Sequence, residues 1–311
     1  MTQLAQESEN CPLCGTATSH LVLIKDDYPL VRCTGCSLIY VCPMPTPEAI
    51  RAHYQDPAYF AGAAEQGYAD YDAMQKALAP HFARRLAVLA RALPQRGRLL
   101  DVGCAAGFFL QQARADGWQI AGVELAREMA DQAAARLQIP IASILAELAP
   151  GQFDAITLWE VIEHVPDPVA FLQALAARLQ PGGVLMLSTP NTAHWQAQRA
   201  PEQWISYRPP AHLIYFTKPT LCAAVGRANL DVQQVWRTFP LPPIPMWVQP
   251  LSRPLAAKLG SGELGPGQAW QAGLWLWRSV RVGAWGWQRI AHPHDDIFAT
   301  LELLARRPPA G

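Results

Sequence analysis

The sequence predicts an α/β fold in which a doubly wound, Rossmann-like sheet of seven strands follows a small cysteine-rich head. Two observations predict it. From Arg98 onward, short apolar segments alternate with amphipathic helical segments, as in parallel sheets whose two faces are covered by helices. Near the N-terminus, four cysteines stand in two Cys-x-x-Cys pairs, a spacing typical of small metal-stapled units.

Composition bounds the class of protein. Half of the 311 residues are hydrophobic and 16% are charged, so the chain can bury a sizeable core. The 25 Lys and Arg residues balance 25 Asp and Glu residues, and this neutral total argues against a nucleic acid as the partner. The opening MTQLAQESEN has no basic start or apolar stretch, and no segment approaches the ~18–20 apolar residues of a membrane span. We therefore expect a cytoplasmic location.

The head is expected to span residues 1–45 and to form a zinc ribbon. Gly15 and Gly35 give the two cysteine turns the backbone freedom that they need. Four thiolates in two pairs make a closed, tetrahedral structural zinc site, whereas two disulfides or free thiols are the alternative. Because no secretory signal is visible, we expect zinc. The four ligands are Cys11, Cys14, Cys33 and Cys36.

Residues 46–93 are expected to form a helical connector. It opens with the proline-rich PMPTPEAI and ends with QKALAPHFARRLAVLARAL, whose leucines and alanines recur at helical spacing. The tyrosines between these stretches either close a ligand pocket or fill the seam between domains. Residues 94–311 are expected to form the main domain.

Each element of the main domain follows from its local pattern. RLLDVGCAAGFFL, from Arg98, gives a strand, a glycine turn and the start of a helix. The helix expected at 167–183 has Asp167 as its N-cap and Pro168 in its first turn. The other expected helices are 127–138 and 217–230, and the other expected strands are 119–126, 139–145, 153–160, 183–191, 231–238 and 297–307.

Four turns of this pattern are expected to meet in one crevice. Ligands of doubly wound sheets bind at the carboxyl ends of the strands, near the point where the strand order switches. Residues 103–107, 124–126, 160–164 and 189–191 all follow expected strands at that end. The sequence therefore predicts a binding crevice that these four segments line.

The glycine turn favours an adenosyl cofactor over a dinucleotide. A dinucleotide fingerprint read from Gly103 needs glycines where this chain has Ala105 and Phe108. Asp101, just before the turn, can pair with a cationic ligand and would repel a pyrophosphate. Glu124 follows about twenty residues later, where an acid can bind the hydroxyls of a ribose.

Residues 98–238 resemble the class I S-adenosylmethionine-dependent methyltransferases, in the large group related to the ubiquinone-biosynthesis O-methyltransferases. The resemblance rests on DVGCAAG, GVELA, FDAITLWEVIEHVPDPVAFL, LQPGGVLMLSTPN and AHLIYFTKPTL. The head, with the following IYVCPMPTPEAIRAHYQDPAYF, resembles a subgroup with a zinc-binding head, to which some sugar C-methyltransferases belong.

The resemblance implies S-adenosylmethionine as cofactor and assigns residues to it. Asp101, Gly103 and Gly107 would flank the methionine moiety, and Glu124 would bind the ribose. The family's usual second glycine is Ala105 in this chain. The full expected cofactor set is Asp101, Gly103, Cys104, Gly107, Glu124, Leu125 and Glu160.

The stretch WEVIEHVPDP carries the first candidate catalytic residues. If the chain turns helically after Trp159, then Glu160, Glu163 and His164 share one face beside the methyl donor. His164 is suited to remove a proton from the acceptor. The related quinone O-methyltransferases have E-x-x-E-H here and are taken to bind a divalent cation such as Mg²⁺. Three hypotheses stay open: a metal site, a general base without metal, and a scaffold in which the histidine caps a turn.

Two further histidines compete for a role at the acceptor. His212, in RPPAHLIYF, is expected on the loop after the fifth strand, where the family often lines its substrate pocket. His194, in NTAHWQ, lies on the same loop with weaker support. For either residue, the alternative is an ordinary hydrogen-bonded loop histidine.

Residues 240–293 are expected to form a proline- and tryptophan-rich insertion before the last strand. Within it, 269–290 has the pattern of an amphipathic helix with arginines on one face. Such a helix could touch a membrane peripherally, cover an apolar or lipid-linked acceptor, or simply pack on the sheet.

The sequence thus predicts a methyltransferase that acts on a small molecule or glycan, at oxygen. One alternative is a ribosomal RNA methyltransferase with a zinc-ribbon head, which a basic, aromatic-rich face would favour. The other is a non-catalytic cofactor-binding scaffold whose head recruits a protein partner.

Overall fold

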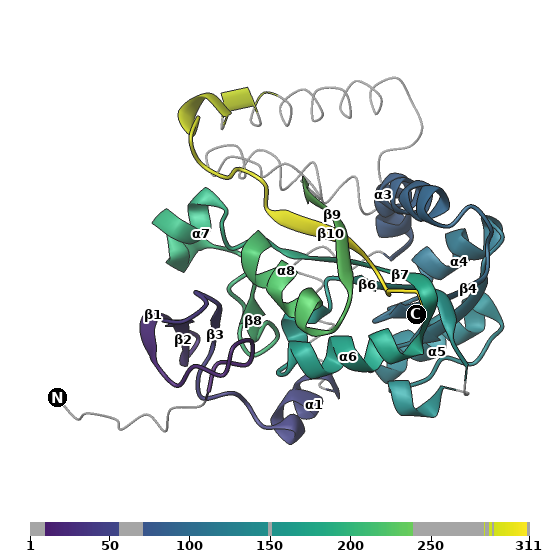
Figure 1. Ribbon diagram of the computed structural model, residues 1–311, viewed down its shortest axis with the longest axis horizontal. Helices are drawn as coiled ribbons and strands as arrows, with labels where there is room; N and C mark the ends of the chain where they lie inside the picture. The colour runs from purple at the N-terminus through teal and green to yellow at the C-terminus, as the bar shows by residue number, and fades with distance from the viewer. Residues whose placement is uncertain are drawn as a thin grey trace.

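The computed structural model describes residues 10–55, 71–148, 151–238 and 289–309, together with 283, 286 and 287. A central sheet of six strands lies between helices, and a four-stranded sheet packs beside it, near the N-terminus (Figure 1). The α/β class and the Rossmann-like arrangement predicted from the sequence are confirmed.

The central sheet has the order β5-β4-β6-β7-β10-β9. The first four strands are parallel, and β10 runs antiparallel to both of its neighbours. Because both faces are covered, the central strands bury nearly every side chain and appear in the sequence as apolar runs. The strands are β4 (Arg98–Val102), β5 (Gln119–Val123), β6 (Phe153–Trp159), β7 (Leu179–Pro190), β9 (Asp231–Thr238) and β10 (Thr300–Arg306).

The strand expected at 139–145 does not form, so the sheet of the described chain has six strands where the sequence predicts seven. Only Ala142 makes an isolated parallel bridge, to Val123. Immediately afterwards the Glu147 carboxylate accepts the N–H of Ser143 at 2.7 Å. The N–H of Ser143 is therefore bonded within this turn and does not donate to a neighbouring strand.

Helices cover both faces of the central sheet, and each face has its own apolar core. Leu99 and Leu100, neighbours on β4, point into different cores. The core of Leu100 is covered by α6 and α8, and that of Leu99 by α3, α4 and α5. The helices are α1 (Pro47–Gln55), α3 (Tyr71–Ala92), α4 (Phe108–Ala115), α5 (Arg127–Leu137), α6 (Pro168–Arg178), α7 (Trp195–Arg199) and α8 (Lys218–Arg227).

The start of α6 is the one the sequence predicts. Asp167 is the N-cap, and its carboxylate accepts the N–H of Ala170 at 2.9 Å, with Pro168 in the first turn. This cap fixes where the segment after β6 ends and the helix begins.

The smaller sheet has the order β1-β2-β3-β8. Its first three strands are β1 (Ser19–Lys25), β2 (Tyr28–Cys33) and β3 (Ile39–Val41), all from the head. Its fourth strand, β8 (Ile214–Tyr215), comes from the main domain. Buried residues of the head and of the main domain also belong to one apolar core, so the sequence boundary expected near residue 45 crosses continuous packing.

Within the described residues, no helix is long and apolar enough to cross a membrane. Most of the tryptophan-rich insertion expected at 240–293, including most of the amphipathic segment 269–290, lies outside the described residues. The membrane contact and the acceptor lid predicted there therefore stay predictions.

Candidate active site

The glycine turn after β4 is tightly packed and presents a helix N-terminus. Gly103 has φ 74°, and a β-carbon there would lie 2.5 Å from Val161 Cγ2. Gly107, with φ 81°, precedes the first turn of α4, which has no side-chain cap. The first N–H groups of α4 therefore point back into the turn after β4, as in nucleotide-binding turns. Ala105 also has a positive φ, 44°, at the position where the family usually has glycine.

Glu124 joins the turns that follow β4 and β5. Its Oε2 accepts the N–H of Ala105 at 2.8 Å, and its Oε1 accepts the N–H of Ala126 at 2.9 Å. Burial raises the pKa of the Glu124 carboxyl. Leu125, the next residue, and Ile144, in the segment after the Ala142 bridge, are among the few exposed large apolar side chains of the described chain. The predicted cofactor residues of β4 and β5 therefore lie together at the carboxyl ends of their strands.

Asp101 lies inside the sheet rather than on the crevice wall. It is 1% exposed, and its Oδ1 accepts the Thr157 hydroxyl at 2.6 Å. Burial raises the pKa of Asp101 to about 7, against the hydrogen bond from Thr157 and the nearby Arg85. Its neighbour Cys104 is also buried.

Arg85 is a residue that sequence reasoning missed. Its guanidinium lies 4.0 Å above the ring of Trp159, and its Nε donates to Glu302 Oε1 at 3.1 Å. Arg84 donates to the other oxygen of Glu302, which is almost wholly buried in β10. No sequence signal could have found the two arginine contacts to Glu302, because these partners are more than two hundred residues apart.

A second cluster lies at the end of β6 and contains Glu163, His164 and His212. One ligand atom of each lies within 4.8 Å of the others. Glu163 is 1% exposed, and its Oε2 accepts the Thr189 hydroxyl at 2.9 Å. Its Oε1 is buried without a hydrogen-bond partner among the described residues and lies 4.0 Å from His164 Nε2. Burial, then the charge of Glu160, raises the pKa of Glu163 well above its ordinary value.

Main-chain carbonyls orient both imidazoles. His164 Nδ1 lies 2.7 Å from the Ala211 carbonyl, and His212 Nδ1 lies 2.8 Å from the Ser206 carbonyl. A carbonyl can only accept, so we assign the proton of each neutral ring to Nδ1. Burial lowers the pKa of His164 to about 4 and that of His212 well below its ordinary value. Both rings are therefore neutral at physiological pH, with Nε2 as the basic atom.

Tyr54, from α1, also contacts the histidine cluster. Its hydroxyl lies 2.5 Å from His164 Nδ1 and 3.3 Å from the Ala211 carbonyl. Tyr54 falls among the connector tyrosines for which the sequence left two hypotheses open. At this position a connector aromatic faces the histidine cluster.

Glu160 does not join the cluster. The chain leaves β6 with Glu160 at φ 56°, and the short 3-10 helix η3 (Ile162–His164) begins only at the second residue after it. Glu160 is exposed, and among the described residues His212 takes the third place beside Glu163 and His164. Two nitrogens and one oxygen are not the oxygen set that Mg²⁺ prefers, so the Mg²⁺ site expected at 160–164 is not supported.

His194 belongs to a different group. Its Nδ1 accepts the N–H of Gln196 at 3.3 Å and caps α7, while its ring stacks on Trp204 at 4.6 Å. Burial lowers the pKa of His194 to about 4. This packing agrees with the alternative of an ordinary loop histidine.

The four head cysteines converge on one point. Their Sγ atoms are 3.6 Å apart in the Cys11–Cys36 pair and 3.5 Å apart in the Cys14–Cys33 pair, and none forms a disulfide. All four lie within 4.8 Å of one another. A tetrahedron of thiolates around zinc has edges of about 3.8 Å. The expected turn at Gly15 has a φ of 77°. The cluster is therefore compatible with zinc.

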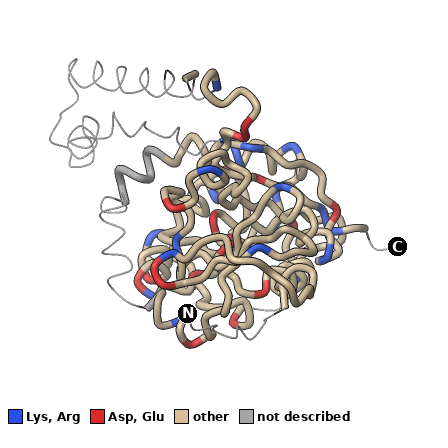
Figure 2. The backbone as a smooth tube through the Cα atoms, turned by 90° about the vertical axis from the view of Figure 1, so that its left-hand side faces the viewer, with Lys and Arg blue, Asp and Glu red and all other residues tan. Residues whose placement is uncertain are grey.

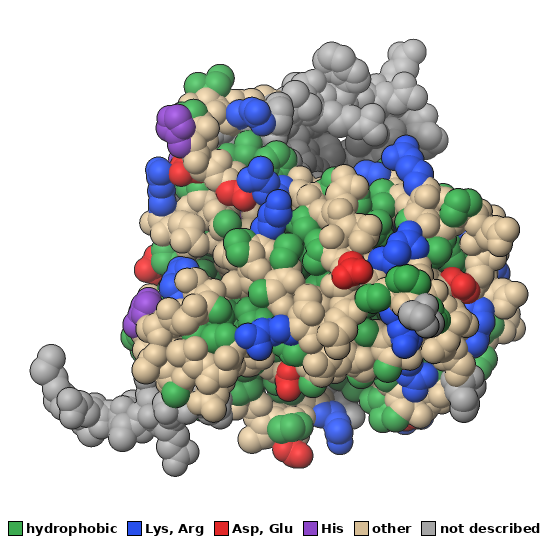
Figure 3. Space-filling model, viewed as in Figure 1, with side chains coloured by type: hydrophobic (Ala, Val, Ile, Leu, Met, Phe, Trp, Pro, Cys, Tyr) green, Lys and Arg blue, Asp and Glu red, His purple; other side chains and the backbone are tan. Residues whose placement is uncertain are grey.

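Charged side chains are dispersed over the surfaces in view. Lys and Arg alternate with Asp and Glu along the described chain (Figure 2). On the face in Figure 3 the basic side chains stand apart among apolar and uncharged ones. The face in Figure 3 has no continuous basic surface of the kind that a nucleic acid would need.

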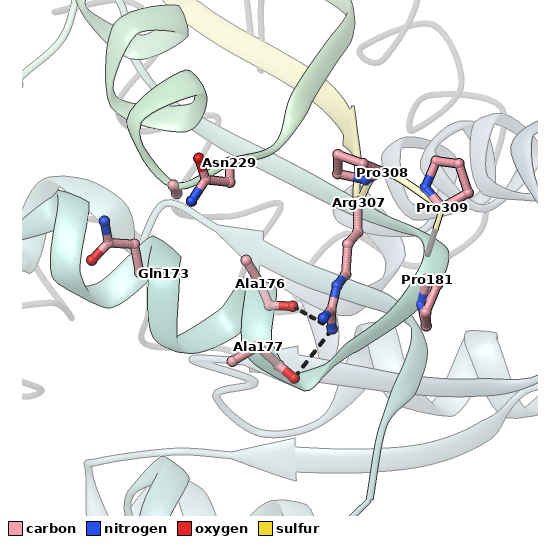
Figure 4. Close-up of a pocket in the computed structure, with 9 residues that line it drawn as sticks. Gln173, Ala176, Ala177, Pro181, Asn229, Arg307, Pro308 and Pro309 are labelled. Carbon is pink, nitrogen blue, oxygen red and sulfur yellow. Dashed lines mark hydrogen bonds between the residues drawn. The ribbon is translucent and has the colours of Figure 1, made fainter. Parts of the chain in front are cut away.

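A surface cavity of about 390 Å³ lies at the opposite, amino-terminal edge of the strands (Figure 4). Arg307 extends across it and donates to the carbonyls of Ala176 and Ala177, at 3.1 and 3.3 Å. These are the last carbonyls of α6, so Arg307 acts as a cap of that helix. The cavity is remote from the carboxyl ends where the clusters lie.

Comparisons with known proteins agree with this geometry. The family described as "Methyltransferase domain" matches residues 73–235. A ubiquinone biosynthesis O-methyltransferase from Xanthomonas campestris pv. campestris (strain B100) is 33% identical over 209 residues, which cover 62% of this chain and 87% of the relative.

Two solved structures share the fold at low sequence identity. A Haemonchus contortus phosphoethanolamine N-methyltransferase 2 in complex with S-adenosyl-L-methionine has a TM-score of 0.56 and 18% identity, and the match covers 88% of this chain and 63% of that one. The magnesium protoporphyrin IX methyltransferase of Synechocystis PCC 6803 with bound SAH has a TM-score of 0.50 and 13% identity, with 84% and 100% covered. The chain thus belongs to the methyltransferase-domain family and is an S-adenosylmethionine-dependent methyltransferase.

Proposed function

We propose that the protein methylates a hydroxyl oxygen of a small molecule or glycan, lipid-linked acceptors included, which binds at the Glu163–His164–His212 cluster. The observation that carries the proposal is this buried polar cluster beside the cofactor turn. Val161, two residues before Glu163, packs directly against Gly103. A methyl donor bound at the turn after β4 would therefore lie close to the cluster.

The crevice of β4 and β5 is the proposed cofactor site. The N–H groups at the start of α4 and the carboxylate of Glu124 face the positions of the methionine and ribose moieties. Glu124 would exchange the N–H of Ala105 for ribose hydroxyls. The exposed apolar side chains of Leu125 and Ile144 would cover the adenine, which removes their area from water.

The chemistry asked of the cluster is alignment and removal of one proton. The acceptor oxygen attacks the methyl carbon as the bond from that carbon to sulfur breaks, and the acceptor proton moves to an imidazole Nε2. As the new C–O bond forms, the hydroxyl proton becomes strongly acidic. A neutral imidazole with a pKa near 4, such as His164, is then basic enough to accept it.

The name of the curated relatives supports oxygen as the acceptor atom, since they are O-methyltransferases. The position of His212 on the segment after β7 agrees with the acceptor-side role that its sequence motif predicts. The dispersed charge on the face in Figure 3 gives no support to an RNA substrate.

The test is the fate of a labelled methyl group. Purified protein and methyl-labelled S-adenosylmethionine are incubated with cell extract, which is then separated into RNA, protein, lipid, glycan and small-molecule fractions. Label in the small-molecule, glycan or lipid fraction, at alkali-stable O-methyl groups, supports the proposal. Label in RNA or in protein contradicts it.

Two variants complete the test. His212→Gln keeps the size of the side chain and should lose methyl transfer while S-adenosylmethionine still binds. Gln196→Ala, on α7, changes an amide outside the cluster and serves as the control. Bound cofactor without label in any fraction, from several extracts, would favour a non-catalytic scaffold.

A further inference from the structure

The metal-binding head supplies the sheet that holds the proposed acceptor site. We define residues 211–216, which contain His212 and β8, as the acceptor segment; all six are buried. Strand β3 of the head pairs with it through Ile39 and Tyr40. In addition, the N–H of Val41 donates to the Leu213 carbonyl at 2.9 Å.

The acceptor segment in turn positions two members of the histidine cluster. The N–H of Leu213 donates to the Glu163 carbonyl at 2.8 Å. The Tyr215 hydroxyl donates to the His212 carbonyl at 2.7 Å. One short strand therefore ties the backbones of Glu163 and His212 to the head.

Two cysteines of the thiolate cluster lie at the turn that leads into β3, so the cluster fixes the position of β3 next to the acceptor segment. Cys33 is the last residue of β2, and Cys36 lies in the turn that leads from β2 into β3. Main-chain bonds from Ser37 to Cys33 and from Cys33 to Leu38 close this turn at 3.0 and 2.9 Å. A head of about forty residues is too small for a stable core of its own, and metal binding supplies folding energy to such units.

Val161 packs against the cofactor turn, but the hydrogen bonds that hold this turn are separate from those of the acceptor segment. The N–H of Gly103 donates to the Val123 carbonyl at 2.8 Å, and Glu124 links the turns after β4 and β5. These bonds lie within the central sheet and its helices. Loss of the metal should therefore reach the acceptor side before it reaches the cofactor side.

We propose that the metal-bound head is a working part of the acceptor site, and that occupancy of the Cys₄ cluster controls the order of the acceptor segment independently of cofactor binding. The proposal rests on the proposed function in one respect, because it takes His212 to face the acceptor. Under this proposal, the protein without its metal would still bind S-adenosylmethionine but could no longer orient an acceptor.

The experiment uses the full chain loaded with zinc and the same protein after treatment with a strong zinc chelator. Hydrogen–deuterium exchange is measured on peptides that cover 206–216 and on peptides that cover 98–110, and S-adenosylmethionine affinity is measured by calorimetry. We expect exchange in the acceptor segment to rise by about tenfold or more after zinc removal, since it loses its sheet partner. We expect the Kd for S-adenosylmethionine to change by less than about twofold.

Zinc added back to the chelated protein should restore slow exchange in the acceptor segment. Unchanged exchange there after verified zinc loss would overturn the proposal, and so would loss of cofactor binding in parallel, which indicates global unfolding. Neither readout needs an acceptor, so the outcome is independent of whether the proposed oxygen methylation is found.

A matched pair of variants separates metal loss from thiol loss. Cys36→Ser removes one ligand of the cluster, and Cys222→Ser removes a half-buried free thiol on α8. Cys36→Ser should bind less zinc and reproduce the fast exchange of the chelated protein, whereas Cys222→Ser should behave as the unaltered chain. If Cys36→Ser does not fold, chelation and zinc re-addition decide the question alone.

Discussion

Val161 packs against Gly103 so closely that a β-carbon at residue 103 would lie 2.5 Å from Val161 Cγ2. Because Gly103 has no side chain, the turn after β4 and the segment after β6 can pack directly against each other. Any substitution that separates them should disturb the cofactor site and the histidine cluster at once.

Gly103→Ala is expected to weaken S-adenosylmethionine binding by about tenfold or more, because the clash adds to the cost of a positive φ. Gly182→Ala is the matched control, since Gly182 has φ 79° but nothing within 4 Å of its added β-carbon. It should lose about 1 kcal/mol of stability and keep its affinity. Calorimetry and urea unfolding measure the two effects, and equal affinities for the two variants would contradict this prediction.

Glu124→Gln should lower S-adenosylmethionine affinity by about tenfold, because an amide replaces one acceptor oxygen with a donor. In the present structure each oxygen of Glu124 already accepts a main-chain N–H. Glu128→Gln, on the exposed side of α5, is the control and should leave the affinity unchanged. The prediction fails if both variants bind the cofactor as the unaltered chain does.

The sequence predicts the strands and turns of the main domain well because their signals are local. The strands are apolar runs, the turn at Gly103 is a short motif, and Asp167 caps α6 within three residues of its partner. The strand expected at 139–145 fails for a local reason as well. Glu147 can bond to Ser143, and apolar periodicity carries no information about that choice.

The acceptor half could be predicted only in part, because its contacts are distant in the chain. His164 and His212 were singled out by motif, but the spacing that suggested Glu160 as their companion assumes a helical turn that begins too early. Strand β8 joins the head through residues more than 170 positions away along the chain. The local sequence of β8 carries no information about such a distant pairing.

The depressed pKa of His164 predicts how stability depends on pH. The imidazole takes up a proton near its ordinary value of 6.5 when unfolded and near about 4 when folded. Because the unfolded state binds more protons in this window, stability should fall as pH decreases from 6.5 toward 4. At about pH 5 the loss from this one residue amounts to about 2 kcal/mol.

His164→Gln removes that proton uptake, so its free energy of unfolding should depend less steeply on pH between about 7.5 and 5. Asp101, whose pKa is raised to about 7, contributes the opposite dependence, since its stabilising effect is lost as pH rises. It is present in both proteins and cancels in the comparison. Parallel stability curves for the two proteins would show that His164 titrates normally.

Removing the hydroxyl of Tyr215 or of Tyr207 tests how much each hydroxyl contributes to the stability of the acceptor segment. Their rings pack edge to face at 4.9 Å, and both are buried. The Tyr215 hydroxyl donates to His212, whereas that of Tyr207 has no partner among the described residues. Tyr215→Phe should cost about 1 kcal/mol of stability, and Tyr207→Phe should cost nothing or stabilise. Urea unfolding of both variants gives the comparison, and the reverse order would contradict it.

The Arg85–Glu302 pair is expected to support the sheet under the cofactor crevice. Glu302 is almost wholly buried, and Arg85 is its better shielded partner, at 11% side-chain exposure against 41% for Arg84. Arg85→Met should therefore destabilise the protein by about 3 kcal/mol, because the buried Glu302 carboxylate loses the better shielded of its two arginine partners. Adding Glu302→Gln should recover part of that loss, since the amide carries no charge.

Arg127→Met is the matched surface control for this prediction. Arg127 lies 3.9 Å from Asp131 on α5, with both side chains open to solvent, so its removal should leave stability unchanged within error. If Arg85→Met is as harmless as Arg127→Met, then Arg84 alone satisfies Glu302. In that case the cation above Trp159 is free to act on a ligand, and the effect of Arg85→Met would appear in cofactor affinity instead of stability.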